Sequence, residues 1–186
     1  MFQIRFSTDE IGYWAQRYVD GSTSRNWGLE QRIENLIVPL VRNKSYLDRD
    51  EFVTICEWKS PRPRRFYERN DEEVIQETTQ IALSTSDERI KIGTLRGLRG
   101  VEWPVASAIL HFCSSDPYPV LDFRALWSLG VERKSYNFEF WWSYVVYCRT
   151  MADQLGVTKR VLDRALWQYS NENQPRKARC KKIAIG

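Results

Sequence analysis

The sequence predicts an all-α fold that forms one compact helical domain. Three segments carry apolar residues at spacings of three and four, which places them on one face of a helix. These stripes are Leu29, Ile33, Leu36, Ile37 and Leu40; Val74, Ile75, Thr78, Ile81 and Ala82; and Val161, Leu162, Ala165, Leu166 and Tyr169. The apolar and polar alternation typical of a strand is almost absent. With 42% hydrophobic and 13% aromatic residues, a chain of 186 residues has enough apolar surface for a packed core.

Local signals mark the ends of several of these helices. Asp48 or Asp50 is expected to cap a helix that ends before Pro61, because proline cannot continue a helical hydrogen-bond ladder. Thr158 is the expected N-cap of the third stripe. Residues 138–155 are apolar on nearly every side, so we expect them to form a central buried helix.

The charge distribution divides the chain into a domain and a tail. Residues 171–186 hold five basic residues and one acid, which accounts for the whole net charge of +4, so residues 1–170 are neutral. We therefore expect a helical domain over 1–170 and a basic, mobile tail over 171–186. Any DNA affinity of the domain must come from local clusters. The best cluster is Arg62, Arg64 and Arg65 with Arg96 and Arg99, and a solvated surface is the equally simple interpretation of it.

Composition also excludes several classes of protein. No apolar run approaches the ~18 residues of a membrane-spanning helix, and the N-terminus lacks the pattern of a signal peptide. We therefore expect an intracellular protein of the cytoplasm or nucleoid with no membrane partner. The cysteines, Cys56, Cys113, Cys148 and Cys180, are widely spaced, and His111 is the single histidine. The sequence thus predicts reduced cysteines and no metal site.

Residues 94–130 are the most informative stretch for function. Gly97 and Gly100 allow a tight turn with positive backbone φ, and Pro104 favours the first turn of a following helix. The pattern predicts a helix, a short hairpin and a second helix. The run Pro119-Val120-Leu121-Asp122 then leads into another helical segment, for which Asp122 is a natural N-cap.

These motifs resemble the helix-hairpin-helix DNA glycosylases, the HhH-GPD superfamily. Their hairpin reads roughly Leu-Pro-Gly-Val-Gly and is followed by a Gly/Pro-rich stretch and an aspartate. Leu98-Arg99-Gly100-Val101-Glu102 is similar to the hairpin, and Pro119-Val120-Leu121-Asp122 is similar to the family's Pro-Ile-Leu-Asp. The resemblance implies an HhH-GPD fold and a monomeric enzyme that binds double-stranded DNA. Such an enzyme hydrolyses the N-glycosidic bond of a flipped damaged or mispaired base.

The resemblance also implies roles for particular residues. Asp122 is the catalytic carboxylate, because breaking a glycosidic bond builds positive charge on C1′ that an anion stabilises. The hairpin residues Gly97, Arg99, Gly100, Val101 and Trp103 contact DNA, with backbone N–H groups directed at one phosphate. Lys59, Arg62, Arg64 and Arg65 lie where family members place the loop that fills the gap left by the flipped base. Trp58 and Phe66 are the candidates for stacking on a base.

Three departures from the family pattern bear on these expectations. Pro104 stands where bifunctional members have their nucleophilic lysine, so a Schiff base from that position is excluded and a monofunctional enzyme is expected. Lys59 is the nearest alternative amine, although an exposed cation at a helix end is its simpler interpretation. Only Cys148 and Cys180 follow Asp122, so we expect no iron–sulfur cluster and no other cofactor. Glu102 occupies the position of the family's second glycine.

Two alternatives remain open from the sequence. The first is a non-catalytic helix-hairpin-helix module that binds DNA without excising a base. The second is a helical interaction protein with no DNA role, which would lack the steep salt dependence of duplex binding. A cavity at Asp122 with room for a base favours the enzyme, whereas a site filled by the chain's own tryptophans favours the module.

Overall fold

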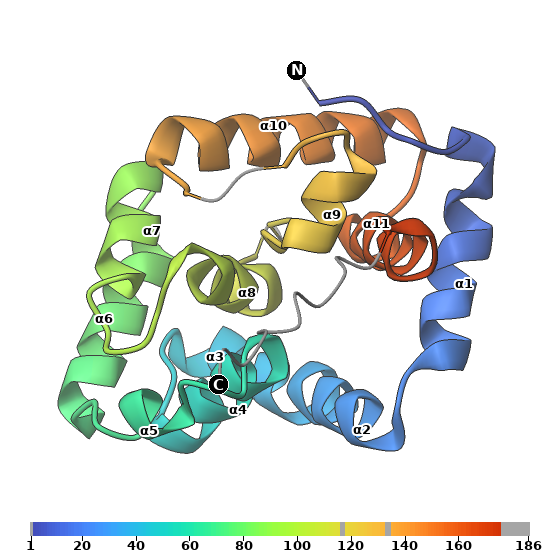
Figure 1. The fold of residues 1–186 in the computed structure, drawn as a ribbon. Coiled ribbons are helices and arrows are strands. Elements are labelled where there is room, and N and C mark those ends of the chain that lie inside the picture. The colour runs from blue at the N-terminus through green and yellow to red at the C-terminus, as the bar shows by residue number, and fades with distance from the viewer. Residues whose placement is uncertain (1, 116–117, 133–134, 176–186) are drawn as a thin grey trace, which may run out of the picture.

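The computed structural model describes residues 2–115, 118–132 and 135–175, and within them the regular structure is helical, with no β-strand (Figure 1). The first half comprises η1 (Thr8–Glu10), α1 (Ile11–Gly21), α2 (Ser24–Arg32), the π-helical turn η2 (Ile33–Ile37), α3 (Val38–Lys44), α4 (Arg49–Lys59) and α5 (Arg64–Tyr67). The second half comprises α6 (Glu72–Ser84), α7 (Glu88–Leu95), α8 (Trp103–Cys113), α9 (Phe123–Ser128), α10 (Phe138–Gln154) and α11 (Lys159–Asn173). The predicted all-α class is therefore confirmed over these residues.

The predicted helix caps form where local sequence places them. Asp48 is the N-cap of α4, and its carboxylate accepts a hydrogen bond from the Glu51 N–H at 2.9 Å. The Glu51 side chain bonds back to the Asp48 N–H at 2.9 Å, which completes a capping box. Thr158 caps α11 by accepting from the Val161 N–H at 3.1 Å. Each cap needs only neighbours within three residues, so the sequence alone predicts it.

The central helix is α8, and the expectation that residues 138–155 would be central is wrong. Every residue of α8 except Pro104 is buried, and Figure 1 shows α8 inside a frame formed by α10, α1, α2, α4, α6 and α7. The small residues Ala106, Ser107 and Ala108 let neighbouring helices approach α8 closely. By contrast, α10 runs along the edge of the molecule and buries one face, leaving Val146 exposed on the other.

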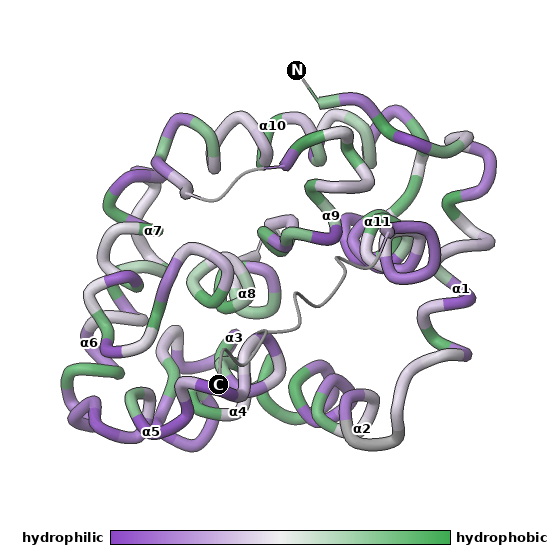
Figure 2. Tube along the Cα trace, viewed as in Figure 1, coloured by the Kyte–Doolittle hydropathy of each residue, from purple (hydrophilic) through white to green (hydrophobic). Residues whose placement is uncertain are grey.

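The buried stripe of α2 to α3 differs from the predicted one because of the π-helical turn. The Val38 N–H donates to the Ile33 carbonyl, five residues back, so this turn holds one more residue than an α-helical turn. Ile33, Ile37 and Val41 consequently face the core, whereas Leu36 and Leu40 are exposed. Polar and apolar segments alternate along the outer helices in Figure 2, as expected for helices that bury one face.

The last described helix, α11, packs against the first long helix, α1. It also packs against α9, and the N-terminal segment crosses α9 through hydrogen bonds from the Gln3 N–H to the Leu129 carbonyl and from the Arg5 N–H to the Ser128 carbonyl, both 2.9 Å. α11 continues past the predicted domain end at residue 170 to Asn173. The rest of the predicted tail, residues 176–186, lies outside the described residues.

In the part of the chain that is described, no helix combines the length and apolar character needed to cross a bilayer.

Candidate active site

Asp122 lies at the N-terminus of α9 and is held from two sides. One carboxylate oxygen accepts a hydrogen bond from the Arg124 N–H at 2.7 Å, so Asp122 is the predicted N-cap. The other oxygen forms an ion pair with Lys59 Nζ, donated from the end of α4. Only 13% of the Asp122 side chain is exposed. The cap therefore orients the carboxylate while leaving its second oxygen to a charged partner.

Lys59 is not the exposed cation that its place at a helix end suggests. It is the last residue of α4, and the following Ser60 is extended (φ −152°, ψ 97°), as expected for a residue that precedes proline. The chain turns away at Pro61, so the Lys59 side chain is directed at α9 and keeps only 9% of its surface exposed. A lysine this buried is rare unless it is paired. The tertiary structure thus joins two residues that are far apart in the sequence.

The pair lines a cavity of about 300 Å³, which we call the Lys59–Asp122 cavity. This volume is at the lower end of the range for small-molecule sites. Its lining residues are Tyr18, Asn26, Leu29, Glu57, Trp58, Lys59, Pro61, Val120, Asp122, Asp163 and Trp167. Three aromatic residues thus share a cavity with one amine and three carboxyl groups. The base-stacking candidate Trp58 is here, whereas Phe66 is not among the lining residues.

A buried ionic network supports one wall of the cavity. Glu30 is almost fully buried and forms ion pairs with Arg160 and Arg164. Its carboxylate also accepts hydrogen bonds from the Tyr18 hydroxyl at 3.2 Å and from the Trp58 indole N–H at 3.3 Å. Two of the aromatic lining residues are therefore fixed at their polar ends by the same carboxylate.

The pKa values of two carboxyl groups in this network are shifted in opposite directions. Burial disfavours the charged form of Glu30, but Arg160 and Arg164 outweigh it and hold the Glu30 pKa below its usual value. Arg160 also pairs with Asp163 at 2.6 Å. Burial nevertheless raises the pKa of Asp163 to about 6, with Arg160 offsetting part of the rise. Burial therefore disfavours the charged form of Asp163 in the cavity.

The connection between α7 and α8, residues 96–102, forms a tight turn that we call the α7–α8 turn. Gly100 has φ +85°, and a Cβ there would lie 2.9 Å from the Tyr67 ring, so glycine is required for both conformation and space. The Asn70 side chain accepts from the Arg99 N–H at 2.8 Å and donates to the Arg99 carbonyl at 3.2 Å. The turn is thereby attached to the segment that contains α5.

The predicted DNA-contact residues of this turn divide into two groups. Gly97 and Arg99 are exposed and Gly100 is half-buried, whereas the side chains of Val101 and Trp103 are buried. The N–H groups of residues 97, 98 and 101 donate to carbonyls within the turn and the preceding helix. The Arg99 N–H donates to the Asn70 side chain. Among the backbone N–H groups of residues 97–101, only that of Gly100 therefore has no partner in the described chain. Most of the N–H groups expected to face a phosphate are therefore already used.

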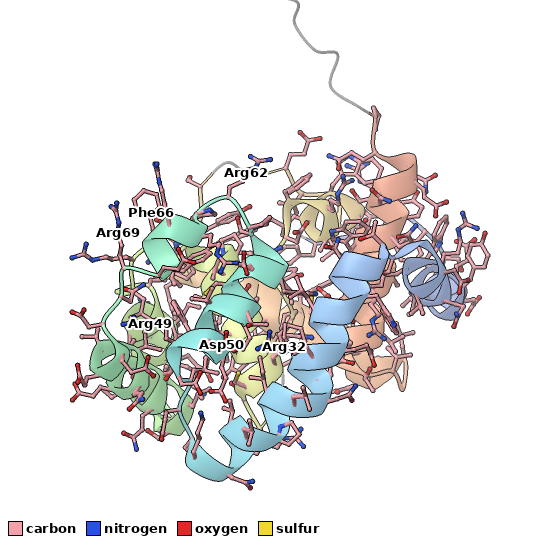
Figure 3. The ribbon with its side chains drawn as sticks, turned by 90° about the horizontal axis from the view of Figure 1, so that it is seen from below. Arg32, Arg49, Asp50, Arg62, Phe66 and Arg69 are labelled. Atoms are coloured by element: carbon pink, nitrogen blue, oxygen red, sulfur yellow. The ribbon has the colours of Figure 1, made fainter. Side chains whose placement is uncertain are left out.

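Arg62, Arg64, Arg65, Phe66 and Arg69 surround α5, and we call them the arginine surface. Figure 3 shows Arg62, Phe66 and Arg69 at the outer edge of the molecule, and 38% of Phe66 is exposed. Arg64 pairs with Glu57 at 2.6 Å and with Glu68 at 2.7 Å. Within the described chain, the other three arginines of this surface form no ion pair, and the Arg65 guanidinium lies over the Phe66 ring at 4.8 Å from its centroid. Three positive charges are thus uncompensated around one exposed ring.

The arginine surface adjoins both the cavity and the α7–α8 turn. Glu57 lines the cavity and also binds Arg64, and Pro61 lines the cavity one residue before Arg62. On the other side, Gly100 contacts the residues of α5. The sequence-predicted residues Lys59, Asp122, Arg62, Arg64 and Arg65 therefore belong to one continuous region, although Lys59 and Asp122 lie inside it and the arginines on its surface.

Sequence reasoning missed the residues that α1, α2 and α11 contribute to the cavity. These are Tyr18, Asn26, Leu29, Asp163 and Trp167. One of these residues could have been found from the sequence. Asp163 directly follows Leu162, a member of the apolar stripe of its helix, and a buried carboxylate needs a partner or a function. The other residues look like ordinary members of amphipathic helices, and only the packing of α1 and α2 near α11 assembles them.

The cavity does not carry the ligands of a metal centre. Over residues 2–115, 118–132 and 135–175, no group of three or more histidine, cysteine, aspartate or glutamate side chains is arranged to hold a metal ion. Cys56, Cys113 and Cys148 are buried free thiols, and Cys180 lies outside the described residues.

Comparison of the chain with profiles of known protein families, with characterised protein sequences and with solved structures finds no match.

Proposed function

We propose that this protein is a DNA N-glycosylase that releases a damaged or mispaired base by hydrolysis, with Asp122 stabilising the sugar cation. The observation that supports the proposal most directly is the position of Asp122, which lines a partly aromatic cavity bordered by the arginine surface. An excised base must leave the duplex stack and enter a cavity, because the enzyme cannot reach the glycosidic bond otherwise. The motif resemblance of residues 94–130 to the helix-hairpin-helix glycosylases points the same way.

The chemistry follows from how the carboxylate is held. As the glycosidic bond breaks, C1′ gains positive charge, and a fixed carboxylate lowers the energy of that transition state more than that of the ground state. The Arg124 N–H fixes one oxygen of Asp122 at 2.7 Å, so the group loses little orientational freedom when substrate enters. Tyr18, Trp58 and Trp167 supply flat apolar surfaces on which a flipped base can stack.

Duplex binding is assigned to the arginine surface rather than to the net charge of the domain. Arg62, Arg65 and Arg69 have no carboxylate partner in the described chain, so they are available to phosphates and would release counterions on binding. Phe66 stands among them as an exposed ring that could insert between base steps. Among residues 97–101, the Gly100 N–H is the backbone donor that has no partner in the described chain and remains for a phosphate oxygen.

The decisive experiment is a base-release screen. Purified full-length protein is incubated with a panel of duplexes that each carry one lesion or mismatch, and strands are resolved before and after alkali. Monofunctional hydrolysis gives cleavage only after alkali. The proposal fails if no duplex in a broad panel loses a base while the same preparation binds DNA.

A second candidate function is supported by the ion pair itself. Lys59 neutralises Asp122, and both side chains are largely buried, which is also the arrangement expected of a structural pair in a non-catalytic DNA-binding module. In that case duplex binding still depends on Arg62 and Arg65, no duplex of the lesion panel loses a base, and Asp122→Asn leaves duplex binding unchanged. The lesion screen and the charge-reversal variants described below separate the two functions.

A further inference from the structure

A second cavity, of about 670 Å³, lies at the N-terminal end of α11, and we call it the α11 cavity. Its walls come from η2 and α3, from the C-terminal end of α8 and from the turn that leads into α11. Its lining residues are Glu34, Val38, Pro39, Arg42, His111, Phe112, Gly156, Val157, Thr158, Lys159 and Arg160. None of them lines the Lys59–Asp122 cavity. Its volume lies within the range of small-molecule sites, and the proposed base release makes no use of it.

His111 presents an unused hydrogen-bond acceptor to the α11 cavity. The residue is only 5% exposed, and its Nδ1 lies 2.5 Å from the Tyr118 carbonyl oxygen. A carbonyl oxygen can only accept, so Nδ1 carries the proton. Burial and the nearby Arg160 guanidinium lower the His111 pKa to about 3, so the ring is neutral at neutral pH and Nε2 is an acceptor.

The Nε2 atom of His111 faces the side of the ring that lines the cavity. Because Nδ1 is directed at Tyr118, the opposite edge of the ring, which carries Nε2, is turned toward the cavity. No donor in the described chain binds this nitrogen. An acceptor this deeply buried is rarely left without a partner in a folded protein, so it points to a ligand that brings a hydroxyl or N–H donor.

The N-terminus of α11 supplies the complementary groups, which are donors and positive charge. The first N–H groups of a helix have no acceptor within the helix, and the Thr158 side chain caps only that of Val161. The N–H groups of Lys159 and Arg160 have no acceptor among the described residues. Arg42 is exposed, and in the described chain it forms neither an ion pair nor a hydrogen bond. Together with the positive end of the α11 dipole, these groups form a site for an anion.

The rest of the lining is compatible with an anion that carries an apolar body. Glu34 is the carboxylate among the lining residues, and it approaches Arg160 at 3.9 Å and Arg164 at 3.5 Å, so its charge is countered. An apolar wall is formed by Val38, Pro39, Phe112 and Val157. The α11 cavity therefore combines anion-binding donors, one acceptor and an apolar surface.

We propose that the α11 cavity binds a 5′-mononucleotide. The phosphate accepts hydrogen bonds from the Lys159 and Arg160 N–H groups and pairs with Arg42. A ribose hydroxyl or a base N–H donates to His111 Nε2, and the base packs on the apolar wall. Inorganic phosphate lacks the apolar body and a nucleoside lacks the anion, so neither meets all three requirements. The proposal is independent of base release at Asp122.

The first test is isothermal titration calorimetry of the full-length protein with the 5′-monophosphates of adenosine, guanosine, cytidine and uridine. Inorganic phosphate and the four nucleosides are titrated in parallel. We expect at least one mononucleotide to bind, and its nucleoside and inorganic phosphate to bind about tenfold more weakly or worse, the loss expected when a charged hydrogen bond or the apolar contact is removed. The proposal is overturned if no mononucleotide binds, or if inorganic phosphate binds as tightly, which would indicate an anion site only.

The second test places the ligand beside His111 without any substitution, so folding does not affect it. His111 is the single histidine of the chain, and isotopic labelling of histidine ring nitrogens therefore gives one Nδ1 and one Nε2 resonance in nuclear magnetic resonance spectra. Saturation with the tightest-binding mononucleotide should shift the Nε2 resonance in the direction of a hydrogen-bonded nitrogen and leave Nδ1 nearly unchanged. An unchanged Nε2 resonance in the saturated complex would place the ligand elsewhere and refute the site.

A pair of arginine variants tests the phosphate end. Arg42→Gln should weaken mononucleotide binding by about tenfold, because it removes the charged partner of the phosphate. Arg89→Gln is the matched control, since Arg89 is exposed on α7 outside the α11 cavity and its loss changes the net charge equally. Equal weakening by both variants would mean that the nucleotide responds to overall charge, and the proposed site would then be wrong. The lesion screen enters none of these measurements, so either proposal can fail alone.

Discussion

The α7–α8 turn and the Lys59–Asp122 cavity differ in how the chain builds them. The turn is made from consecutive residues, and its glycines and their neighbours indicate it in the sequence. The cavity is assembled from α1, α2, α4, α11 and the cap of α9, so no stretch of sequence describes it. The turn uses most of its hydrogen-bonding groups internally, whereas the cavity gathers charged groups that need partners. The α7–α8 turn is thus chiefly a structural connection between two helices, and the proposed chemistry lies where segments distant in the sequence meet.

The largest effect should come from removing the support of the cavity wall. Glu30→Ala leaves Arg160, Arg164, the Tyr18 hydroxyl and the Trp58 indole without their shared acceptor, and unpaired buried charges typically cost about 3–5 kcal/mol. We expect the free energy of unfolding in urea to fall by this amount. Glu34→Ala is the control, because Glu34 is more exposed and approaches the same arginines at 3.5 and 3.9 Å. Equal losses in the two variants would show that the network does not depend on Glu30.

The second prediction separates the cap role of Asp122 from its chemistry. Asparagine caps a helix about as well as aspartate but carries no charge. Asp122→Asn should therefore keep the fold and slow base release by about 100-fold or more, the loss expected when one transition-state contact is removed. Duplex affinity should stay equal or rise. Asp87→Asn is the matched control, since Asp87 caps α7 in the same way but lies outside the cavity. Unchanged base release in Asp122→Asn would remove Asp122 from the mechanism.

The third prediction concerns the structural role of the turn. Gly100→Ala combines a left-handed backbone with a Cβ 2.9 Å from Tyr67, and we expect a loss of about 1–3 kcal/mol in unfolding free energy. Gly156→Ala places alanine at φ +63° with no atom within 4 Å of the new Cβ, so it isolates the backbone strain at about 1 kcal/mol. If the free energy of unfolding falls less in Gly100→Ala than in Gly156→Ala, α5 moves to accommodate the new side chain and the predicted clash is wrong.

The fourth prediction tests whether the arginine surface binds the DNA backbone. Arg62→Glu with Arg65→Glu should weaken duplex binding and reduce the dependence of log affinity on log salt by about 1 per arginine. Arg17→Glu with Arg89→Glu changes the net charge equally on α1 and α7, away from α5, and should have little effect (Figure 1). Equal weakening in both pairs would indicate a response to net charge rather than a defined surface.

The last prediction is a pH dependence assigned to Asp163. Its pKa is about 6 in the folded protein against an ordinary value of 3.8, so the folded state binds this proton more tightly than the unfolded chain. The contribution of Asp163 to the free energy of unfolding should therefore fall as pH rises between 3.8 and about 6 and stay constant above that. The difference between wild type and Asp163→Asn, measured by urea unfolding across this range, isolates that slope. Parallel curves would contradict the assignment.

The sequence by itself determined the features that depend on neighbours within about one helical turn. Asp48, Thr158 and Asp122 cap their helices as predicted, because a side chain and the N–H groups two or three residues on are always within reach. The all-α class follows from the same short-range periodicity. The turn at Gly100 was equally predictable, since a positive φ leaves glycine as the natural residue there.

Periodicity did not determine which apolar faces the molecule would bury. The π-helical turn at Ile33–Ile37 changed which leucines face the core, and α8, which carries small residues, lies at the centre whereas α10 lies at the edge. Both outcomes depend on the shapes of packed neighbours. A stripe in one helix carries no information about the helix that will cover it.

The tertiary structure alone decided the character of Lys59. Its local sequence predicts an exposed cation at the end of a helix before a proline, and nothing within one turn marks it as buried. The fold placed the C-terminal end of α4 near the N-terminus of α9, which brought its ammonium to the Asp122 carboxylate, and α11 added Asp163 to the same cavity. Ionisable groups interact through space over a few ångströms regardless of their separation along the chain, so their partners appear only when the fold is complete.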